Sequence, residues 1–268
     1  MRSLRFALAA AAMIASTAFA SPAAPVNGAE FTTLATPQPT QVVGKKIEVI
    51  EFFAYHCPAC NMMEPHVAEW LKKHKDDVVF KRVAFPFKGA NDPESHLFLT
   101  LEAMGKAEEV GPRVFRAFHI ERVRLNTEEQ ILDWVGKGSG VDKAKFMEYW
   151  NSFGVLTKLK RLPQIAASYK IDSTPMFVVD GRYLTSPSMI GAANPALERQ
   201  IFEASKTTLD ALVAKAMKEK GFDAPAAAPA KAEAKAASKA VKADAKTAKT
   251  NAKADAKVAK TAAKTAAK

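Results

Sequence analysis

The chain is 268 residues long, with 48% hydrophobic residues, two cysteines and a net charge of +11. The positive charge lies at the ends: from residue 224 onward eleven lysines face three acidic residues, whereas residues 21–223 hold 26 basic and 25 acidic residues. A nearly neutral central region excludes a basic nucleic-acid-binding fold. Its length, about 200 residues, suits one domain or a domain with an insertion.

Residues 1–20 have the pattern of a secretory signal peptide. Arg2 and Arg5 precede an apolar run at residues 6–14, and an A-F-A motif ends at Ala20. The run is too short to span a bilayer, and the motif is typical of a cleavage site. We therefore predict cleavage after Ala20 and export to the periplasm, in preference to a buried N-terminal helix.

The next segments predict the start of a sheet. Residues 21–45 are rich in Pro, Thr and Ala and predict an extended lead-in. Residues 46–55, KIEVIEFFAY, are apolar on both faces and rich in β-branched and aromatic residues, which predicts a buried central strand. The cysteines follow at once. An amphipathic helix is expected to about residue 75, and a second strand over residues 78–85.

Residues 91–168 are expected to form consecutive helices that make up an inserted helical domain. Asn91 or Asp92 caps the first helix, ahead of Pro93. Residues 127–130 form a capping box, and Asp142 precedes a third helix. The apolar residues of these helices recur at helical spacing and are expected in the core: Leu97, Leu101, Met104, Ile131, Leu132, Val135, Phe146, Trp150 and Phe153.

The chain then returns to strand patterns. Residues 176–185 predict two short strands joined by a turn at Asp180 and Gly181. Residues 194–220 predict one long amphipathic helix. The order of elements predicts an α/β fold in which residues 46–90 and 169–222 form one domain, interrupted by the helical insertion at 91–168.

Cys57 and Cys60 are the only cysteines in the chain. A structural disulfide stabilises by closing a long loop, and a bridge across two residues constrains almost nothing. Their spacing therefore indicates redox chemistry. At a strand-to-helix junction Cys57 is expected in the first helical turn, exposed to solvent, where free N–H groups and the helix dipole favour a thiolate.

This placement makes Cys57 the attacking thiol and Cys60 the resolving one. Pro58 suits the start of a helix because its missing N–H is not needed there. A c-type haem site would require His where Asn61 stands. A zinc site would need two further ligands, for which only His56 and His66 are near in sequence. We therefore predict no metal ion and no cofactor besides the Cys57–Cys60 disulfide.

Three further residues are candidates around the cysteines. Glu51 lies in the apolar strand, where burial would raise the pKa of its carboxyl and let it exchange a proton with Cys60; the alternative is that it reaches solvent at the strand end. Glu64 is a second candidate acid, with an exposed helix face as its alternative. Thr174-Pro175 opens the later hairpin, and a cis bond there would expose the backbone of Thr174 to a substrate chain.

The segments EFFAYHCPAC (51–60), WNSF (150–153) and STPMFVVDGRY (173–183) resemble the DsbA-type dithiol oxidases of the thioredoxin superfamily. The resemblance covers roughly residues 45–215. It implies a thioredoxin-like domain interrupted by helices, and oxidation of unfolded exported proteins that carry free thiols. It also implies re-oxidation by a DsbB-like membrane oxidant. By motif position Cys57 is the nucleophile, Cys60 its partner, Pro175 the cis-proline, and Glu51 and Glu64 nearby buried acids.

Ala59 departs from the family pattern, which has His between Pro58 and Cys60. Without that His the thiolate loses a favourable charge, which leaves open a disulfide isomerase or reductant instead of an oxidase. His56, directly before Cys57, is a candidate to restore part of the effect. Isomerases of this superfamily dimerise, and residues 21–45 are too short for a dimerisation domain, so a monomer is expected.

The tail at residues 223–268 is almost entirely Ala, Lys and Thr, with a lysine every three or four residues. It has too few apolar residues to join a core. Two interpretations stay open: a disordered tail, or an electrostatic tether to an anionic envelope surface. A third functional hypothesis follows from the tether, namely an envelope-binding protein that acts through its lysines.

Overall fold

A computed structural model describes residues 21–137 and 139–222. The signal peptide predicted at residues 1–20 and the tail predicted at 223–268 lie outside the described residues. Within the described ranges, none of the helices combines the length and the apolar character that crossing a bilayer requires.

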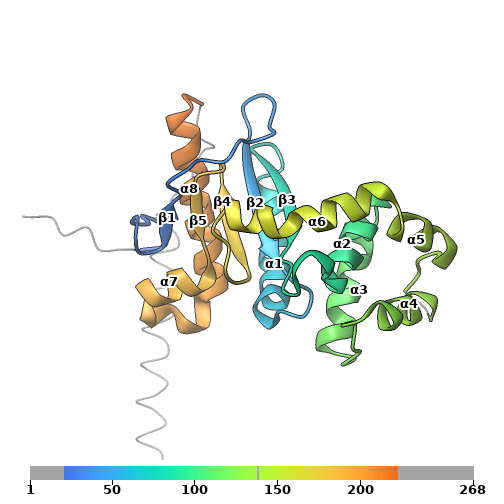
Figure 1. Cartoon of the computed structure of the whole chain (residues 1–268). Coiled ribbons are helices and arrows are strands. Elements are labelled where there is room, and N and C mark those ends of the chain that lie inside the picture. The colour runs from blue at the N-terminus through green and yellow to red at the C-terminus, as the bar shows by residue number, and fades with distance from the viewer. Residues whose placement is uncertain (1–20, 138, 223–268) are drawn as a thin grey trace, which may run out of the picture. The chain divides into compact units, whose positions relative to one another are not determined.

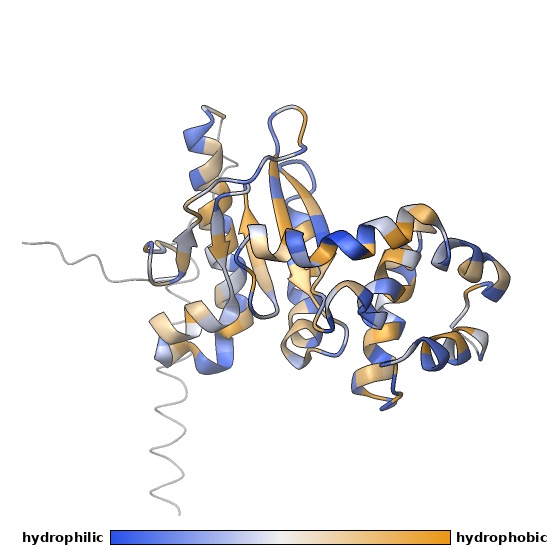
Figure 2. Cartoon of the chain, viewed as in Figure 1, coloured by the Kyte–Doolittle hydropathy of each residue, from blue (hydrophilic) through white to orange (hydrophobic). Residues whose placement is uncertain are grey.

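The centre of the fold is a five-stranded mixed sheet with the strand order β1-β5-β4-β2-β3. Its strands are β1 (Phe31–Thr33), β2 (Ile47–Phe53), β3 (Val78–Ala84), β4 (Met176–Val179) and β5 (Tyr183–Thr185). Strand β2 runs parallel to β3 and antiparallel to β4, and every one of its residues is buried. The predicted buried strand is confirmed, and Figure 2 shows hydrophobic residues concentrated on β2 and β4.

Helices cover both faces of this sheet, as Figure 1 shows. On one face, α1 (Pro58–Lys73) and α8 (Ile201–Glu219) pack on alternate residues of β2 and β4, such as Val49 and Phe177. On the other face, Ile50 and Phe52 of β2 pack against the C-terminal end of α6 (Phe153–Ser168). The two-residue period of the strand therefore supplies both cores.

A block of helices separates β3 from β4. It contains a 3-10 turn (Gly89–Asn91), α2 (Pro93–Ala103), α3 (Ala107–His119), α4 (Glu128–Gly136), α5 (Lys143–Trp150) and α6. Side chains of Asp92, Thr127 and Asp142 cap α2, α4 and α5, as their sequences predicted. Helix α6 runs from this block to the sheet in Figure 1, because Leu159 packs with the block and Ala166 with the strands.

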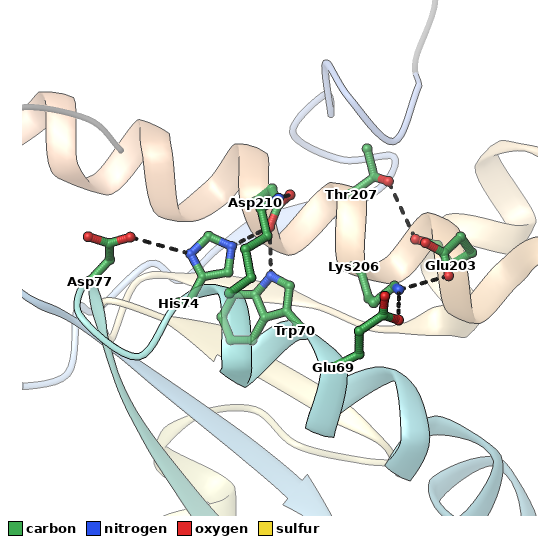
Figure 3. A network of polar contacts seen from close by, with 9 residues as sticks. Glu69, Trp70, His74, Asp77, Glu203, Lys206, Thr207 and Asp210 are labelled. Atoms are coloured by element: carbon green, nitrogen blue, oxygen red, sulfur yellow. Dashed lines mark hydrogen bonds and ion pairs between the residues drawn. The ribbon is translucent and has the colours of Figure 1, made fainter. Parts of the chain in front are cut away.

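A polar network joins α1 to α8 and is drawn in Figure 3. Trp70 Nε1 and His74 Nε2 each lie 2.7 Å from Oδ1 of Asp210, while Lys73 pairs with Oδ2. One helical turn before Asp210, the largely buried Lys206 pairs with Glu69 on α1. These contacts hold α8 against the helix that carries the cysteines.

Two predicted segments differ from the structure at the backbone level. The lead-in at 21–45 is not merely extended: it contains β1, which pairs antiparallel with β5 and forms an edge of the sheet. The single helix predicted at 194–220 is an α-helix only from Ile201 onward: α7 (Pro187–Ala193) precedes the predicted range, a 3-10 segment (Pro195–Gln200) occupies its first residues, and α8 follows. Asn194 precedes a proline and is therefore disfavoured in helical geometry, so it separates the first two.

The predicted core position of Phe153 is wrong. Its side chain is 85% exposed. Helix α5 ends at Trp150, and Ser152 caps a new helix, so the helical spacing that connects Phe153 to Phe146 is interrupted. The hairpin turn is confirmed, since Asp180 and Gly181 both have positive φ angles, 54° and 62°.

Candidate redox site

The cysteine pair lies where β2 gives way to α1. Cys57 is the N-cap of α1, one position earlier than the predicted first turn, and Pro58 opens the helix. The backbone N–H of Cys60 donates a hydrogen bond to Sγ of Cys57 over 3.3 Å. A sulfur atom thus takes the place of the usual oxygen acceptor at a helix N-terminus, where the helix dipole favours negative charge.

Both cysteines are present as free thiols, and they differ in access to solvent. Cys57 is 9% exposed and Cys60 is 0% exposed. The expectation of an openly exposed Cys57 is therefore wrong, because its Sγ lies 3.3 Å from the carbonyl oxygen of Thr174. Only Cys57 retains a path to solvent.

Thr174 and Pro175 come next to Cys57 through the sheet. Their peptide bond is cis and directly precedes β4. Since β4 is antiparallel to β2, with Met176 opposite Phe52, its first residues lie beside the end of β2 that leads into the cysteines. Residues 117 positions apart in the chain thereby share one site.

The two thiols have opposite acidities. Hydrogen bonds from the Cys60 side chain, the Thr174 side chain and the backbone of Cys60 and Ala59 lower the pKa of Cys57 to about 5, against the opposing effect of burial. Burial raises the pKa of Cys60, and its hydrogen bond to Cys57 and the charge of Cys57 raise it further. At neutral pH the arrangement supports a Cys57 thiolate beside a protonated Cys60.

Glu51 is completely buried, so the alternative of a solvent-facing strand end is wrong. The sheet register places it opposite Arg82 on β3, whose Nε lies 3.0 Å from Oε2 of Glu51. Oε1 of Glu51 has no hydrogen-bond partner in the part of the chain that the structure describes. Burial raises the pKa of Glu51, and the attraction of Arg82 offsets only part of this effect.

Glu64 is also held by Arg82, at 2.9 Å, and its side chain is 22% exposed, so the open helix face considered for it is wrong. Burial raises the pKa of Glu64 to about 7, although Arg82 opposes the shift. Arg82 reaches a third carboxylate, Glu108, at 3.2 Å, and Glu108 is 80% exposed. One guanidinium thus links the buried Glu51 to an acid at the surface.

Sequence reasoning missed Arg82. The available signal was an arginine inside an apolar strand parallel to the strand of Glu51, since a buried charge requires a partner. The register between β2 and β3 cannot be derived from the sequence pattern, and this register places Arg82 beside Glu51.

Known proteins share this fold and this motif. The family model described as "DSBA-like thioredoxin domain" matches residues 92–203, and the model "Thioredoxin" matches residues 32–87. The thiol:disulfide interchange protein DsbA of Bordetella parapertussis is 43% identical over 185 residues, which cover 69% of this chain and 87% of the relative. The chain belongs to the DsbA family. It is a thiol:disulfide oxidoreductase.

Structures of DsbA proteins have the same architecture. The crystal structure of Pseudomonas aeruginosa DsbA is 33% identical, with a TM-score of 0.61, and covers 72% of this chain and 95% of its own. Xylella fastidiosa DsbA is 25% identical, with a TM-score of 0.62, and covers 72% and 98%. The predicted α/β thioredoxin-like fold and the predicted family are therefore confirmed.

Ala59, the residue that departs from the DsbA pattern, lies at the edge of an apolar groove of about 550 Å³. The remaining lining comes from α7, the 3-10 segment Pro195–Gln200 and the start of α8: Pro187, Ser188, Gly191, Pro195, Glu198, Ile201 and Phe202. Of the described residues that line the groove, only Ala59, next to Cys60 in the chain, belongs to the cysteine motif of this DsbA protein.

The histidines weighed as metal ligands have other partners. His56 lies 2.7 Å from Glu94, and His66 lies 3.3 Å from Glu203 and stacks on Phe202. Among residues 21–137 and 139–222, no three His, Cys, Asp or Glu side chains gather as a metal site would require.

Proposed function

We propose that this protein is a periplasmic dithiol oxidase that transfers its Cys57–Cys60 disulfide to unfolded exported proteins. The observation that carries the proposal is the asymmetry of the pair: a Cys57 pKa lowered to about 5 beside a buried Cys60 whose pKa is raised. A stabilised Cys57 thiolate favours the reduced form of the enzyme, and this makes its disulfide oxidising.

The exchange takes place in two steps. A client thiolate attacks Sγ of Cys57, forming a mixed disulfide and releasing Cys60, which takes up a proton. A second client thiol loses its proton and attacks the client sulfur of the mixed disulfide, so the client gains a disulfide and Cys57 leaves as a thiolate. Two electrons pass from the client to the enzyme.

Client binding is proposed at two places beside Cys57. The backbone at Thr174, next to Pro175, is available for pairing with an extended client segment. The groove that Ala59 helps to line offers an apolar surface to client side chains. Both features suit unfolded chains, which present backbone and apolar residues together.

Glu51 and Glu64 are proposed to exchange the proton that Cys60 gains and loses. Glu64, with a pKa raised to about 7, can gain or lose a proton at neutral pH. Glu51 is buried close enough for its charge to raise the pKa of Cys60. Arg82 holds both carboxylates, and its contact with Glu108 leads to solvent.

Further features of the proposal follow from the sequence. Export by a cleaved signal peptide at residues 1–20 would place the protein in the periplasm, where disulfides persist. No cofactor is needed besides the disulfide itself. A DsbB-like membrane oxidant would restore the disulfide, and the protein would act as a monomer.

The test combines alkylation with client oxidation. Brief alkylation of the reduced protein should label Cys57 before Cys60, and the rate should rise with pH around pH 5 as the thiolate forms. The Cys60→Ser variant is first treated with glutathione disulfide, so that Cys57 forms a mixed disulfide with glutathione. A thiol of a reduced, unfolded client should then displace glutathione, and the client should stay bound to Cys57, because Cys57 has no resolving partner. The matched Cys57→Ser variant should trap none.

The equilibrium with glutathione separates an oxidase from its rivals. An oxidase disulfide should oxidise reduced glutathione at equilibrium, whereas a reductant would be oxidised by glutathione disulfide. Equal labelling of both thiols, or a reducing Cys57–Cys60 couple, would refute the proposal.

A further inference from the structure

Glu94 binds the residue that precedes the nucleophile. Its Oε1 lies 2.7 Å from Nδ1 of His56, and its Oε2 accepts a hydrogen bond from the backbone N–H of His56 over 3.1 Å. The Glu94 side chain is only 13% exposed, whereas that of His56 is 41% exposed. The ring of Phe87 packs against the imidazole, with centroids 4.8 Å apart.

The position of Glu94 in α2 does not explain this contact. An acidic residue is favourable in the first turn of any helix, but the N-terminus of α2 is already capped by Asp92, which accepts a hydrogen bond from Ser95. Both oxygens of Glu94 instead point to a residue 38 positions earlier in the chain. The contact therefore holds in place the segment that carries Cys57.

We infer that Glu94 is a positioning residue for the redox reaction: it fixes the His56 imidazolium beside Cys57, where the positive charge stabilises the Cys57 thiolate. The inference rests on the proposed oxidase function and assigns two residues that would make the disulfide more oxidising. His56 thereby replaces part of the charge that is absent at Ala59.

The charges around His56 support this assignment. The hydrogen bond to Glu94 raises the pKa of His56 although partial burial opposes it, and the charges of Glu94, Cys57 and Asp92 act in the same direction. Phe87 carries no charge. These contacts therefore favour the protonated form of the imidazole, whose side chain is 41% exposed.

The His56 imidazolium is expected to act in the second step of thiol–disulfide exchange. When the second client thiolate attacks the client sulfur of the mixed disulfide, the client disulfide forms, the bond to Cys57 breaks, and its electron pair stays on Cys57 as a thiolate. The imidazolium stabilises this thiolate without itself losing a proton. Deprotonation of His56 at higher pH removes the stabilisation, so the oxidising power should decrease as pH rises through the pKa of His56.

The experiment compares full-length protein with Glu94→Gln, His56→Ala and the double variant. Glutamine keeps the size of Glu94 and can accept the backbone N–H bond, but it carries no charge. We expect Glu94→Gln to lower the pKa of His56, followed by NMR, and to raise the pKa of Cys57, followed by thiolate absorbance. The equilibrium constant for oxidising glutathione should decrease by about twofold to fivefold, as expected for a partly exposed ion pair.

The double variant tests the connection. In the His56→Ala background, Glu94→Gln should change neither the Cys57 pKa nor the glutathione equilibrium, because the two residues act as one unit. Glu102→Gln is the matched control: Glu102 lies on the same helix and pairs with Lys158 at 2.9 Å, away from the cysteines. It should leave both quantities unchanged.

Two outcomes would overturn the inference. Glu94→Gln with an unchanged Cys57 pKa would show that the contact is structural only, and an undiminished effect without His56 would show that Glu94 acts by another route. Failure of the proposed oxidase function can be told apart from failure of this inference. In the first case the wild-type protein would not oxidise clients, but the titrations of His56 and Cys57 would still show whether Glu94 acts on them. Glu94→Asp should retain most of the wild-type behaviour, since it keeps the carboxylate.

Discussion

Ala59 separates this site from the usual DsbA pattern at the scale of single residues. The acidity of Cys57 here comes from the Cys60 side chain, the Thr174 side chain and backbone N–H groups at the start of α1. None of these contributions needs a side chain at position 59. The Cys60 side chain, the Thr174 side chain and the N-terminus of α1 therefore lower the pKa of Cys57 without any side chain at position 59.

Replacing Ala59 with His measures how much the histidine of the family pattern contributes to the acidity of Cys57 and to the oxidising power of the couple. Ala59→His should lower the Cys57 pKa further and make the couple more oxidising, because a protonated imidazole stabilises the thiolate. A charge contact of ~1–2 kcal/mol corresponds to about 20–45 mV for a two-electron couple. The measurement is the equilibrium with glutathione, together with thiolate absorbance against pH. If neither changes, electrostatics at the helix end dominate and Ala59 does not weaken the oxidant.

Arg82 is the most consequential residue that the sequence pattern did not single out. It is 13% exposed and holds two buried or half-buried acids. Arg82→Met should destabilise the protein by about 3–5 kcal/mol, because one partner of a buried charged cluster is removed and the others remain. Arg82→Lys keeps the charge and should cost less.

The pH dependence of that loss has a definite sign. A carboxyl group whose folded-state pKa is raised costs no stability below its unfolded pKa of 4.5, and its full cost is present above its folded pKa. Without Arg82 the raised pKa values of Glu51 and Glu64 should rise further. The destabilisation of Arg82→Met, followed by denaturant unfolding, should therefore be small near pH 4.5 and largest above pH 7. A loss independent of pH would indicate packing instead of charge.

At the scale of elements, α8 stabilises the redox site from a distance. It carries no cysteine and contacts none of the thiols by hydrogen bond, yet Asp210 accepts bonds from Trp70 and His74 near the end of α1 (Figure 3). Helix α1 holds Cys57 at its other end. The Asp210 network thus fixes the helix whose N-terminus acidifies the nucleophile.

Asp210→Asn should destabilise the fold by about 1–3 kcal/mol, since hydrogen bonds to a charged group become neutral or are lost. Burial opposes ionisation of Asp210, but hydrogen bonds from His74, Lys73 and Trp70 outweigh it and lower its pKa below 3.8. Its stabilisation is therefore present above pH 3.8 and is lost as pH falls through the folded pKa. The difference in unfolding free energy between the two proteins should shrink only in strong acid.

Asp133→Asn is the matched control for that experiment. Asp133 on α4 pairs with Lys137, the C-cap residue of that helix, and both side chains are largely exposed. Its replacement should change stability by less than about 0.5 kcal/mol. If Asp210→Asn costs no more than Asp133→Asn, the α1–α8 network does not stabilise the fold.

At the scale of the whole molecule, charge and catalysis occupy different parts of the chain. Residues 21–223 are nearly neutral, while eleven lysines follow residue 223. The redox site needs none of these lysines. Any binding to an anionic surface should therefore be separable from oxidation.

Removal of residues 224–268 tests this separation. If the tail is a tether, the full-length protein should bind anionic vesicles at low salt and release them as salt rises, because screening shortens to about 8 Å at physiological ionic strength. The shortened protein should lose this binding and keep its oxidase activity. Vesicle binding that does not depend on the salt concentration, or no binding at low salt, would favour the interpretation of a disordered tail.

Much of the fold was predictable because its signals are local. The apolar run of β2, the caps at Asp92, Thr127 and Asp142 and the turn at Gly181 each depend on neighbouring residues. The same holds for the cysteine pair, since its spacing and its strand-to-helix position are adjacent in the chain. The resemblance to the DsbA-type oxidases added the thioredoxin-like arrangement of these parts and the assignment of Pro175 as the cis-proline.

Tertiary structure alone decided which distant residues meet. It paired β1 with β5, placed Thr174 against Cys57, set Arg82 opposite Glu51 and brought Glu94 to His56. Periodicity tells which face of an element is buried, but not which element covers it or in what register. A register shift of one residue reverses the face of every side chain in a strand, so such contacts follow only from the packing of the whole domain.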